Sequence, residues 1–465
     1  MAGLNYLPKE LSSLKKTLIN FILFLVSIAG VVVTLALDRQ LTVPEFFGLV
    51  IVVSSVFVIL YLFLYFFRIE VLQVNRKVFF ILLAIVAFLV STRVVTVLSS
   101  GELLYLIPFA IIPVTIRTFY DARLALFILL VTIMLTGFLV PDPFEFVFIS
   151  FATGMAAIFS LNSNYRKIRL LLAVLIVIGS YTVLWTGLTL IREGSLSAGY
   201  LKTLLFFTIN GFLVLISYPL IFLFEQNFLL LSDATLLELS DTNQPLLRKL
   251  ATDAPGSFQH SLQVSNLAEE AARVIGANVL LVRTGSLYHD IGKIANPEYF
   301  VENQTDGISP HENMDPKESA RIIINHVRNG VNLAKNYKIP VQIIDFIRMH
   351  HGTTVAYYFY KKYIDLHQGE EHADKAFSYP GPKPFSKETA VVMMADAVEA
   401  SSRSLPEYND ETISELVERI IYLQEQDGQF SDVPLTYKDM SDIKDAFKRR
   451  LGNIFHARIV YPDRV

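Results

Sequence analysis

Long apolar runs separated by short polar connections fill the first 225 residues of the chain. A helix that crosses a membrane needs about 20 predominantly apolar residues, and eight runs approach that length. The fourth and sixth runs are the short ones. The pattern predicts a helical membrane domain whose spans are Thr17–Leu37, Phe46–Phe67, Val78–Leu98, Leu103–Ile116, Leu124–Val140, Phe146–Leu161, Ile168–Ile191 and Thr203–Phe224.

The pattern changes after Glu225, where charged residues are interleaved with apolar residues at helical spacing. Stretches such as "SLQVSNLAEEAARVIGA" and "ESARIIINHVRNGVNLAKNY" carry an apolar residue every three or four positions, which is typical of amphipathic helices. The stretch "LLLSDATLLELSDTNQPLLRKL" predicts a helix that continues out of the membrane, a turn at "DTNQP" and a short helix. We therefore expect an all-α protein with a membrane domain (1–225), a helical connector (226–255) and a second helical domain (256–465).

Composition supports the membrane domain and narrows the chemistry of the second domain. Hydrophobic residues make up 53% of the chain and its mean hydropathy is +0.46, which is too apolar for a soluble protein. The net charge of −3 gives no sign of a DNA or RNA polymer as partner. The chain has no cysteine, so disulfides and thiolate ligands are excluded and any metal site must use histidine and carboxylate ligands.

Lysine and arginine are distributed unevenly between the connections, and cytoplasmic connections carry an excess of them. Only Arg39, Arg192 and Lys202 fall in the odd-numbered connections. Eleven fall in the N-terminal tail and the even-numbered connections, namely Lys9, Lys15, Lys16, Arg68, Arg76, Lys77, Arg117, Arg123, Arg166, Lys167 and Arg169. We therefore expect the N-terminus and the C-terminal domain on the cytoplasmic side. Arg93, inside the third span, is expected to reach the interface from near the helix end.

All nine histidines lie in the second region, from His260 onward. Four of them, His311, His367, His372 and His456, are expected to be ordinary surface or core residues. The other five belong, with two aspartates, to a series in which each member falls on or at the end of a different predicted helix, namely His260, His289–Asp290, His326, His350–His351 and Asp396. A helical bundle can direct all of these side chains into one internal cavity.

Imidazole and carboxylate ligands suit Mn²⁺, iron or Zn²⁺. Seven ligands are too many for one ion and match two ions that share a carboxylate. Neighbouring residues on a helix point about 100° apart, so each doublet can serve two sides of such a centre. Two ions about 3.5–4 Å apart can stabilise both the attacking and the leaving oxygen of a phosphodiester.

The series H…HD…H…HH…D resembles that of the HD-domain metal-dependent phosphohydrolases. More specifically, the chain from Phe46 onward resembles the seven-transmembrane HD family, whose members studied as enzymes are cyclic di-AMP phosphodiesterases of bacterial membranes. The segments that carry this resemblance are "LLELSDTNQPLLRKLATDAPGSFQHSLQVSNLAEEAA", "YHDIGKIANPEYFVENQ", "MHHGTT" and "YPGPKPFSKETAVVMMADAVEA".

The resemblance implies two divalent metal ions, Mn²⁺ or Fe²⁺/Fe³⁺, and hydrolysis of cyclic di-AMP to linear pApA at a bacterial cell membrane. It implies that Asp290 bridges the ions, with one bound by His260, His289, Asp290 and Asp396 and the other by His326, His350 and His351. Asp290 and Lys293 are the candidate catalytic residues, and Lys293 either meets a substrate phosphate or is an ordinary solvated lysine. Homodimerisation is a further possibility.

The chain departs from the family pattern in one place. Family members usually carry a large extracytoplasmic domain after the first membrane helix, and here only about eight residues around "DRQLTVPE" fill that place.

Three alternatives to cyclic di-AMP hydrolysis stay open. One is hydrolysis of cyclic di-GMP, although "HHGTTVAYYFY" lacks the Glu and Gly-Tyr-Pro of the HD-GYP type. The others are hydrolysis of ppGpp or another phosphate ester, and nucleotide binding without catalysis. The residues that would select adenine can only be guessed from their nearness in sequence to the metal-type residues, and the candidates are Tyr288, Tyr379 and Arg403.

Overall fold

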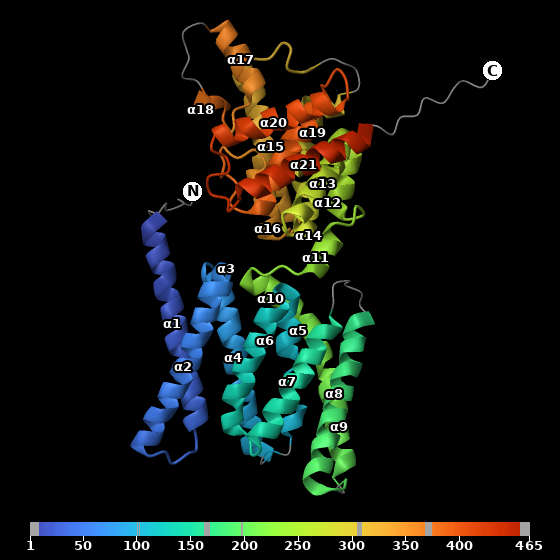
Figure 1. The fold of residues 1–465 in the computed structure, drawn as a ribbon. Helices are drawn as coiled ribbons and strands as arrows, with labels where there is room; N and C mark the ends of the chain where they lie inside the picture. The colour runs from blue at the N-terminus through green and yellow to red at the C-terminus, as the bar shows by residue number, and fades with distance from the viewer. Residues whose placement is uncertain are drawn as a thin grey trace, which may run out of the picture. The chain divides into compact units, whose positions relative to one another are not determined.

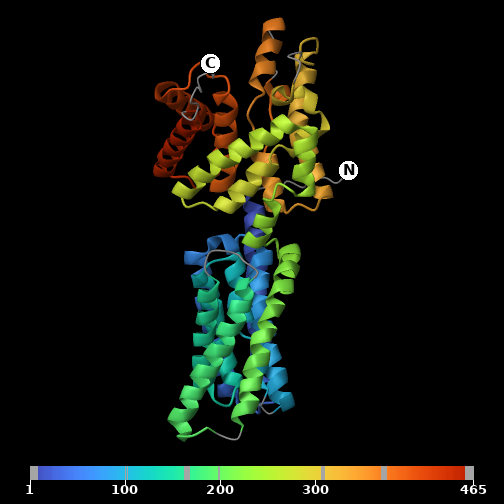
Figure 2. The same cartoon turned by 90° about the vertical axis from the view of Figure 1, so that its right-hand side faces the viewer.

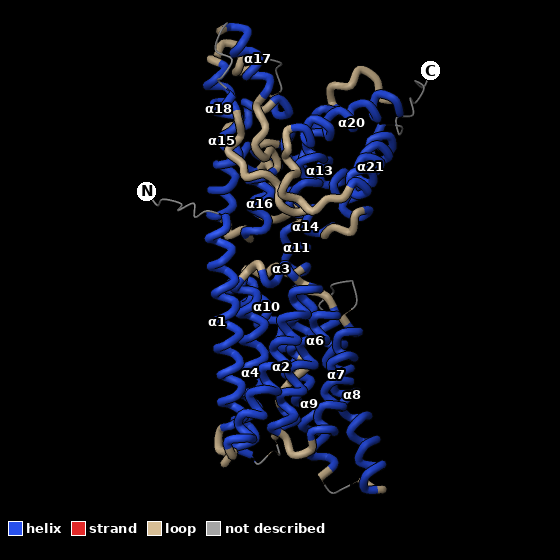
Figure 3. Tube along the Cα trace, turned by 60° about the vertical axis from the view of Figure 1, so that its left-hand side comes forward, coloured by secondary structure: helices blue, strands red, loops and turns tan. Residues whose placement is uncertain are grey.

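The computed structural model describes residues 9–99, 101, 103–161, 168–196, 199–304, 309–367 and 374–455. Within these ranges every regular element is a helix, and the only β-type pairing is an isolated bridge between Val355 and Ser378. The all-α prediction is confirmed, as the tube in Figure 3 shows. The chain divides into two compact units, Met1–Ser232 and Asp233–Val465.

The first unit is a bundle of long helices (Figure 1), and their sequences are predominantly apolar. Short elements link or extend these helices, namely α3 (Ile69–Leu72), η2 (Gly137–Leu139) and η3 (Val214–Ile216). Seven candidate spans among the described residues are long and apolar enough to cross a membrane. They are built on α1 (Lys9–Ala36), α2 (Val43–Phe67), α4 (Asn75–Ser99), α6 (Ala122–Thr136), α7 (Pro143–Ser160), α8 (Ile168–Glu193), and α9 (Tyr200–Leu213) with α10 (Ser217–Phe228).

The fourth predicted span, Leu103–Ile116, is wrong as a continuous helix. It consists of a short 3-10 helix, η1 (Leu104–Leu106), and α5 (Ile111–Phe119), with Pro108 in the break between them. Proline has no N–H to donate and disfavours helical geometry in the residue before it. The side-chain amide of Asn210 donates to the carbonyls of Tyr105 and Ile107 at 2.8 and 2.9 Å, so the break does not leave these two carbonyls unpaired.

The broken segment still returns the chain across the bundle. An ion pair between Arg68 and Asp121 joins the end of α2 to the start of α6. At the opposite end of α2, Arg93 near the end of α4 lies 3.4 Å from Asp38 in the α1–α2 connection. The chain therefore passes from one end of the unit to the other between α4 and α6, which keeps the alternation that the basic residues predict. The contact with Asp38 places Arg93 at the end of the bundle where α1 and α2 are joined.

The second unit is a helical bundle (Figure 2). It starts inside the predicted connector, after Leu229, which has a left-handed conformation (φ 56°) at the end of α10. Its main helices are α13 (Pro255–Val274), α14 (Val279–Tyr288), α15 (Pro316–Asn336), α16 (Val341–Met349), α17 (Tyr357–Leu366), α19 (Lys387–Ser402), α20 (Asp410–Gln426) and α21 (Tyr437–Phe455). Its short elements are α11 (Asp233–Leu239), α12 (Pro245–Asp253), η4 (Ile291–Ala295), η5 (Pro297–Tyr299), η6 (Val301–Asn303) and α18 (Asp374–Phe377).

Helix α13 lies at the centre of this unit and packs against α14, α19 and α21. Small residues such as Ala268, Ala271 and Ala395 are fully buried in this core beside larger ones such as Val391 and Phe447, which allows a close approach of the helices. Side chains cap the starts of four helices of this unit, namely Asn278 for α14, Asp315 for α15, Ser386 for α19 and Asn409 for α20. The result is a closely packed frame with helix faces directed toward one interior point.

Candidate metal centre

The structure brings the seven predicted residues together from five helices or helix ends. His260 lies on α13, His289 ends α14 and Asp290 follows it, His326 lies on α15, the His350–His351 doublet ends α16, and Asp396 lies on α19. Six of the seven are buried, and His351 is partly exposed. Their ligand atoms form three groups within 4.8 Å, namely His326–His350–His351, His260–His289–Asp396 and His289–Asp290–His350.

Two glycines explain how the doublets reach this point. Gly292, just after the His-Asp pair, lies so close to α15 that a Cβ atom there would be 1.8 Å from the carbonyl oxygen of His326. Only glycine permits this approach, which places Asp290 beside His326. Gly352 follows the second doublet with a positive φ of 52°, a conformation that favours glycine and turns the chain away after α16.

The carboxylate of Asp290 lies between two sets of histidines. Its Oδ1 atom is 3.4 Å from Nε2 of His326 and 3.6 Å from Nε2 of His350. Its Oδ2 atom is 3.3 Å from Nε2 of His289 and 3.7 Å from Nε2 of His260. One carboxylate therefore presents a separate oxygen to each set.

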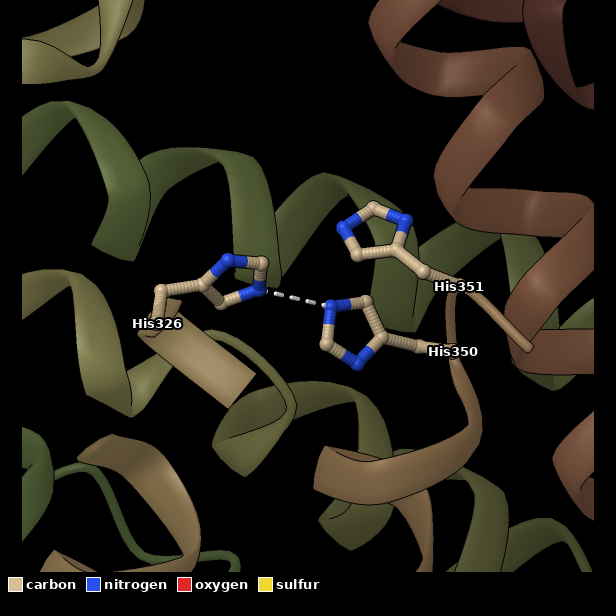
Figure 4. Close-up of side chains that lie close together, drawn as sticks. All are labelled: His326, His350 and His351. Atoms are coloured by element: carbon tan, nitrogen blue, oxygen red, sulfur yellow. Dashed lines mark hydrogen bonds between the residues drawn. The ribbon is translucent and has the colours of Figure 1, made fainter. Parts of the chain in front are cut away.

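The remaining ligand-type side chains complete the two sets. Figure 4 shows His326, His350 and His351 facing one another, with 3.0 Å between the Nε2 atoms of the first two. On the other side, Oδ1 of Asp396 lies 2.8 Å from Nε2 of His260 and 3.5 Å from Nε2 of His289. The second oxygen of Asp396 is 3.7 Å from Nδ1 of His351, so Asp396 also borders both sets.

Backbone carbonyls orient three of the imidazoles. The Nδ1 atoms of His289, His326 and His350 lie 2.6, 2.6 and 3.0 Å from the carbonyl oxygens of the residues three positions earlier, Ser286, Ile323 and Ile347. A proton on Nδ1 would be donated to these carbonyls, which leaves the lone pair of Nε2 free to face the centre. This is the arrangement that a metal-binding histidine requires.

The electrostatics of the site suit cations. Burial lowers the pKa of His351 to about 3, so this ring is neutral at physiological pH. Burial would raise the pKa of Asp290, but Lys293 and His289 outweigh it and hold the pKa well below its usual value. Burial would lower the pKa of His289, but Asp290 and Asp396 raise it to about 10, so a metal ion would displace a proton there.

The buried donor atoms fit divalent metal ions. Among the described residues, Nε2 of His289 and Oδ1 of Asp290 are buried without a hydrogen-bond partner. Such atoms are costly to bury unless something pairs with them. Imidazole nitrogen and carboxylate oxygen are a donor set that Mn²⁺ and iron accept.

Lys293 is neither freely solvated nor isolated. Its ammonium lies 2.6 Å from Oδ2 of Asp290 and 2.8 Å from Oε1 of Glu302, and its side chain is 12% exposed. Burial would lower the pKa of Lys293, but these two carboxylates outweigh it and raise the pKa, so the side chain is protonated at neutral pH. Glu302 also accepts a hydrogen bond of 2.8 Å from Ser257, which ties η6 to the start of α13.

A cavity of about 660 Å³ opens at the centre and is lined by Lys293, His351, Asp396 and Arg403, among others. This volume lies in the range of small-molecule sites, roughly 300–1,000 Å³. Of the three residues suggested as adenine contacts, only Arg403 borders the cavity. The ring of Tyr379 packs against the ring of His351, with 4.2 Å between the ring centroids. The hydroxyl of Tyr288 donates to the carbonyl of Leu239.

Sequence reasoning missed Glu399, which forms a hydrogen bond with His260, and Glu302, the partner of Lys293. The only local signal for Glu399 is its position three residues after Asp396, on the same helix face.

Two of the four excluded histidines lie outside the array, as expected. His311 meets the carbonyl oxygen of Tyr299 at 3.0 Å, and His367 stacks on Tyr363 with 4.3 Å between ring centroids. The other two, His372 and His456, lie outside the described residues.

Comparison with known proteins places both units in families. Residues 257–401 match the model of the HD domain. Residues 43–232 match the model described as a 7TM receptor with intracellular HD hydrolase, and the chain belongs to this seven-transmembrane HD family.

Two curated relatives are named cyclic-di-AMP phosphodiesterase PgpH. The protein of Bacillus subtilis (strain 168) is 41% identical over 67% of this chain, and that of Listeria monocytogenes serotype 1/2a (strain 10403S) is 33% identical over 92%. The chain spans 44% and 60% of the length of these two relatives. A crystal structure of the L. monocytogenes PgpH HD domain in complex with cyclic-di-AMP is 42% identical, with a TM-score of 0.45, covering 46% of this chain and all of that one.

Proposed function

We propose that this protein is a membrane-bound phosphodiesterase that hydrolyses cyclic di-AMP to linear pApA at a dinuclear metal centre. In this proposal one ion is bound by His260, His289, Asp290 and Asp396, and the second by His326, His350, His351 and the shared Asp290. Mn²⁺ and iron are the expected metals.

The position of Asp290 is the observation that carries the proposal. Its two carboxylate oxygens face different histidine sets, which is the geometry that a bridging ligand needs. A site for a single ion would have no use for the second set, because three or four protein ligands already suffice for one ion. The buried Nε2 of His289 and Oδ1 of Asp290 give further support.

The chain's own residues would hold and orient the substrate. When bound, two divalent ions supply Lewis acidity toward both the attacking and the leaving oxygen of a phosphodiester. Lys293 keeps a positive charge beside Asp290, where it can meet a phosphate oxygen of a dinucleotide in the cavity. Arg403 brings a second positive charge to the same cavity.

Cyclic di-AMP is the substrate that the relatives favour, since both of those described above are named for that activity. The cavity volume of about 660 Å³ is compatible with a dinucleotide and does not by itself select adenine. We place the HD domain on the cytoplasmic side, since eleven of fourteen counted basic residues fall on the side of the N-terminus.

The test is a comparison of substrates with the purified full chain. Cyclic di-AMP, cyclic di-GMP and ppGpp would each be incubated with Mn²⁺ or Fe²⁺, and with EDTA as control, and the products identified by chromatography. Metal-dependent formation of pApA from cyclic di-AMP supports the proposal. Faster turnover of cyclic di-GMP or ppGpp would replace the substrate, and tight binding without any product would indicate a non-catalytic receptor.

A further inference from the structure

His260 differs from the three histidines whose Nδ1 atoms face a carbonyl of their own helix. Its Nδ1 atom is hydrogen-bonded to the carboxylate of Glu399, which belongs to another helix, α19. Its Nε2 atom faces Asp396 at 2.8 Å. The ring of His260 is therefore held between two carboxylates of α19 that lie three residues apart.

Glu399 is itself fixed in place. The side chain is buried, and one of its oxygens accepts two hydrogen bonds from Arg403, at 3.0 Å from Nε and 2.7 Å from Nη2. The other oxygen is left for His260. Because Arg403 occupies one oxygen with two donors, the carboxylate has little freedom to turn away from the imidazole.

We propose that Glu399 is a positioning residue that holds the proton of His260 on Nδ1, so that the Nε2 lone pair faces the metal position shared with His289 and Asp396. This inference rests on the dinuclear centre proposed above. A carboxylate that accepts the Nδ1 proton fixes the ring orientation and raises the basicity of Nε2 more than a carbonyl does. Glu399 itself is neither among the residues that line the cavity nor in any of the three ligand groups, and it reaches the centre only through His260.

Loss of Glu399 should weaken the binding of only one of the two ions. Loss of a second-sphere partner of this kind typically lowers metal affinity about 10–100-fold. The ion bound through His260 should be affected, whereas the ion bound through His326 and His350 should not, since their Nδ1 atoms rely on backbone carbonyls. A general loss of folding would weaken both sites together.

The test is a Mn²⁺ titration of the full chain in detergent, with binding followed by calorimetry and helix content by circular dichroism. For Glu399→Ala we expect one site to weaken by about 10–100-fold while the other keeps its wild-type affinity. Glu399→Gln keeps an oxygen that can accept the Nδ1 proton, so its loss should be the smaller of the two. Glu269→Gln is the matched control, because Glu269 forms a comparable ion pair with Arg283, 2.6 Å away, outside the centre.

The outcomes separate the two proposals. A wild-type chain that binds fewer than two Mn²⁺ ions would overturn the dinuclear centre. Two ions in the wild type with unchanged affinities in both Glu399 variants would overturn only the positioning role. Equal weakening of both sites in Glu399→Gln, with helix content retained, would also overturn it, since the effect would then not pass through His260.

Discussion

The ammonium of Lys293 lies 2.6 Å from Oδ2 of Asp290, the same oxygen that faces His289 at 3.3 Å. One carboxylate thus meets a permanent cation on one side and candidate metal ligands on the other. The contact explains why Asp290 is ionised although it is buried, and it holds the ammonium of Lys293 at the edge of the cavity. Lys293 and Asp290 should therefore respond differently to substitution.

Substitution of Asp290 should remove the bridge. In Asp290→Ala both ions lose a common ligand, so we expect Mn²⁺ to be lost from both sites and hydrolysis of cyclic di-AMP to fall to background. Metal analysis and product chromatography measure the two effects. His367→Ala, which stacks on Tyr363 away from the centre, should leave both intact. Full activity in the Asp290 variant would contradict the dinuclear centre.

Substitution of Lys293 should separate chemistry from metal binding. Lys293 is not a ligand-type residue, so Lys293→Met should still bind two Mn²⁺ ions. If the ammonium stabilises phosphate charge, the kcat should fall by about 10²–10³-fold, which is the usual loss for one such electrostatic contact. Lys387→Met, which breaks an ion pair with Asp439, serves as the control. A kcat equal to that of the wild type would leave Lys293 with only a structural role.

Substitution of Gly292 tests how the His-Asp pair is brought to α15. In Gly292→Ala the new Cβ would meet the carbonyl oxygen of His326, so η4 must move. Overpacking of this kind costs about 1–3 kcal/mol. For a unit of this size that lowers the melting temperature by roughly 2–12 °C, and the shift should be accompanied by weaker Mn²⁺ binding.

Gly179→Ala is the control for this prediction, since nothing lies within 4 Å of a Cβ placed at Gly179. Calorimetric unfolding measures the melting temperatures of both variants, and Mn²⁺ titration measures their metal affinities. Equal melting temperatures for the two variants would mean that the helices relax around position 292 without loss.

The seven candidate ligands could be predicted from the sequence because their chemistry is carried by the residue type and by the two doublets. Glu399 could not be predicted, because a glutamate three residues after Asp396 on a helix is equally common on a solvated face. Its role depends on a contact with His260, 139 residues earlier in the chain.

The helical bundle of the membrane unit was also predictable, since long apolar runs permit few other structures. The broken fourth span was missed because hydropathy counts Pro108 as part of an apolar run. Its break depends on backbone geometry and on Asn210, about 100 residues away. A tertiary contact of that range leaves no trace in a hydropathy pattern.

The orientation of the chain in a membrane can be tested with tags. The chain passes across the first unit an even number of times if the broken segment η1–α5 is counted as a pass. Tags fused before Met1 and after Val465 should therefore both be protected from added protease in intact cells. Cleavage of one tag alone would mean that η1–α5 does not cross the bilayer. Cleavage of both would reverse the predicted orientation.

The second unit should work without the membrane helices, provided that α11 is kept. All seven candidate ligands lie in this unit, which has a hydrophobic core of its own. Helix α11 packs against α14 of this unit: Leu236 is only 2% exposed, and its carbonyl accepts a hydrogen bond from Thr284. The carbonyl of Leu239 likewise accepts from Tyr288, immediately before the His-Asp pair.

A fragment comprising residues 233–465 should therefore fold, bind two Mn²⁺ ions and hydrolyse cyclic di-AMP in solution. A fragment comprising residues 245–465 lacks α11 and exposes the side of α14 that leads to His289, so it should be less stable and bind Mn²⁺ more weakly. Melting temperatures and Mn²⁺ titrations of the two fragments give the comparison. If the longer fragment were folded and loaded with metal but inert, while the full chain hydrolysed cyclic di-AMP, the membrane helices would have to take part in completing the active site.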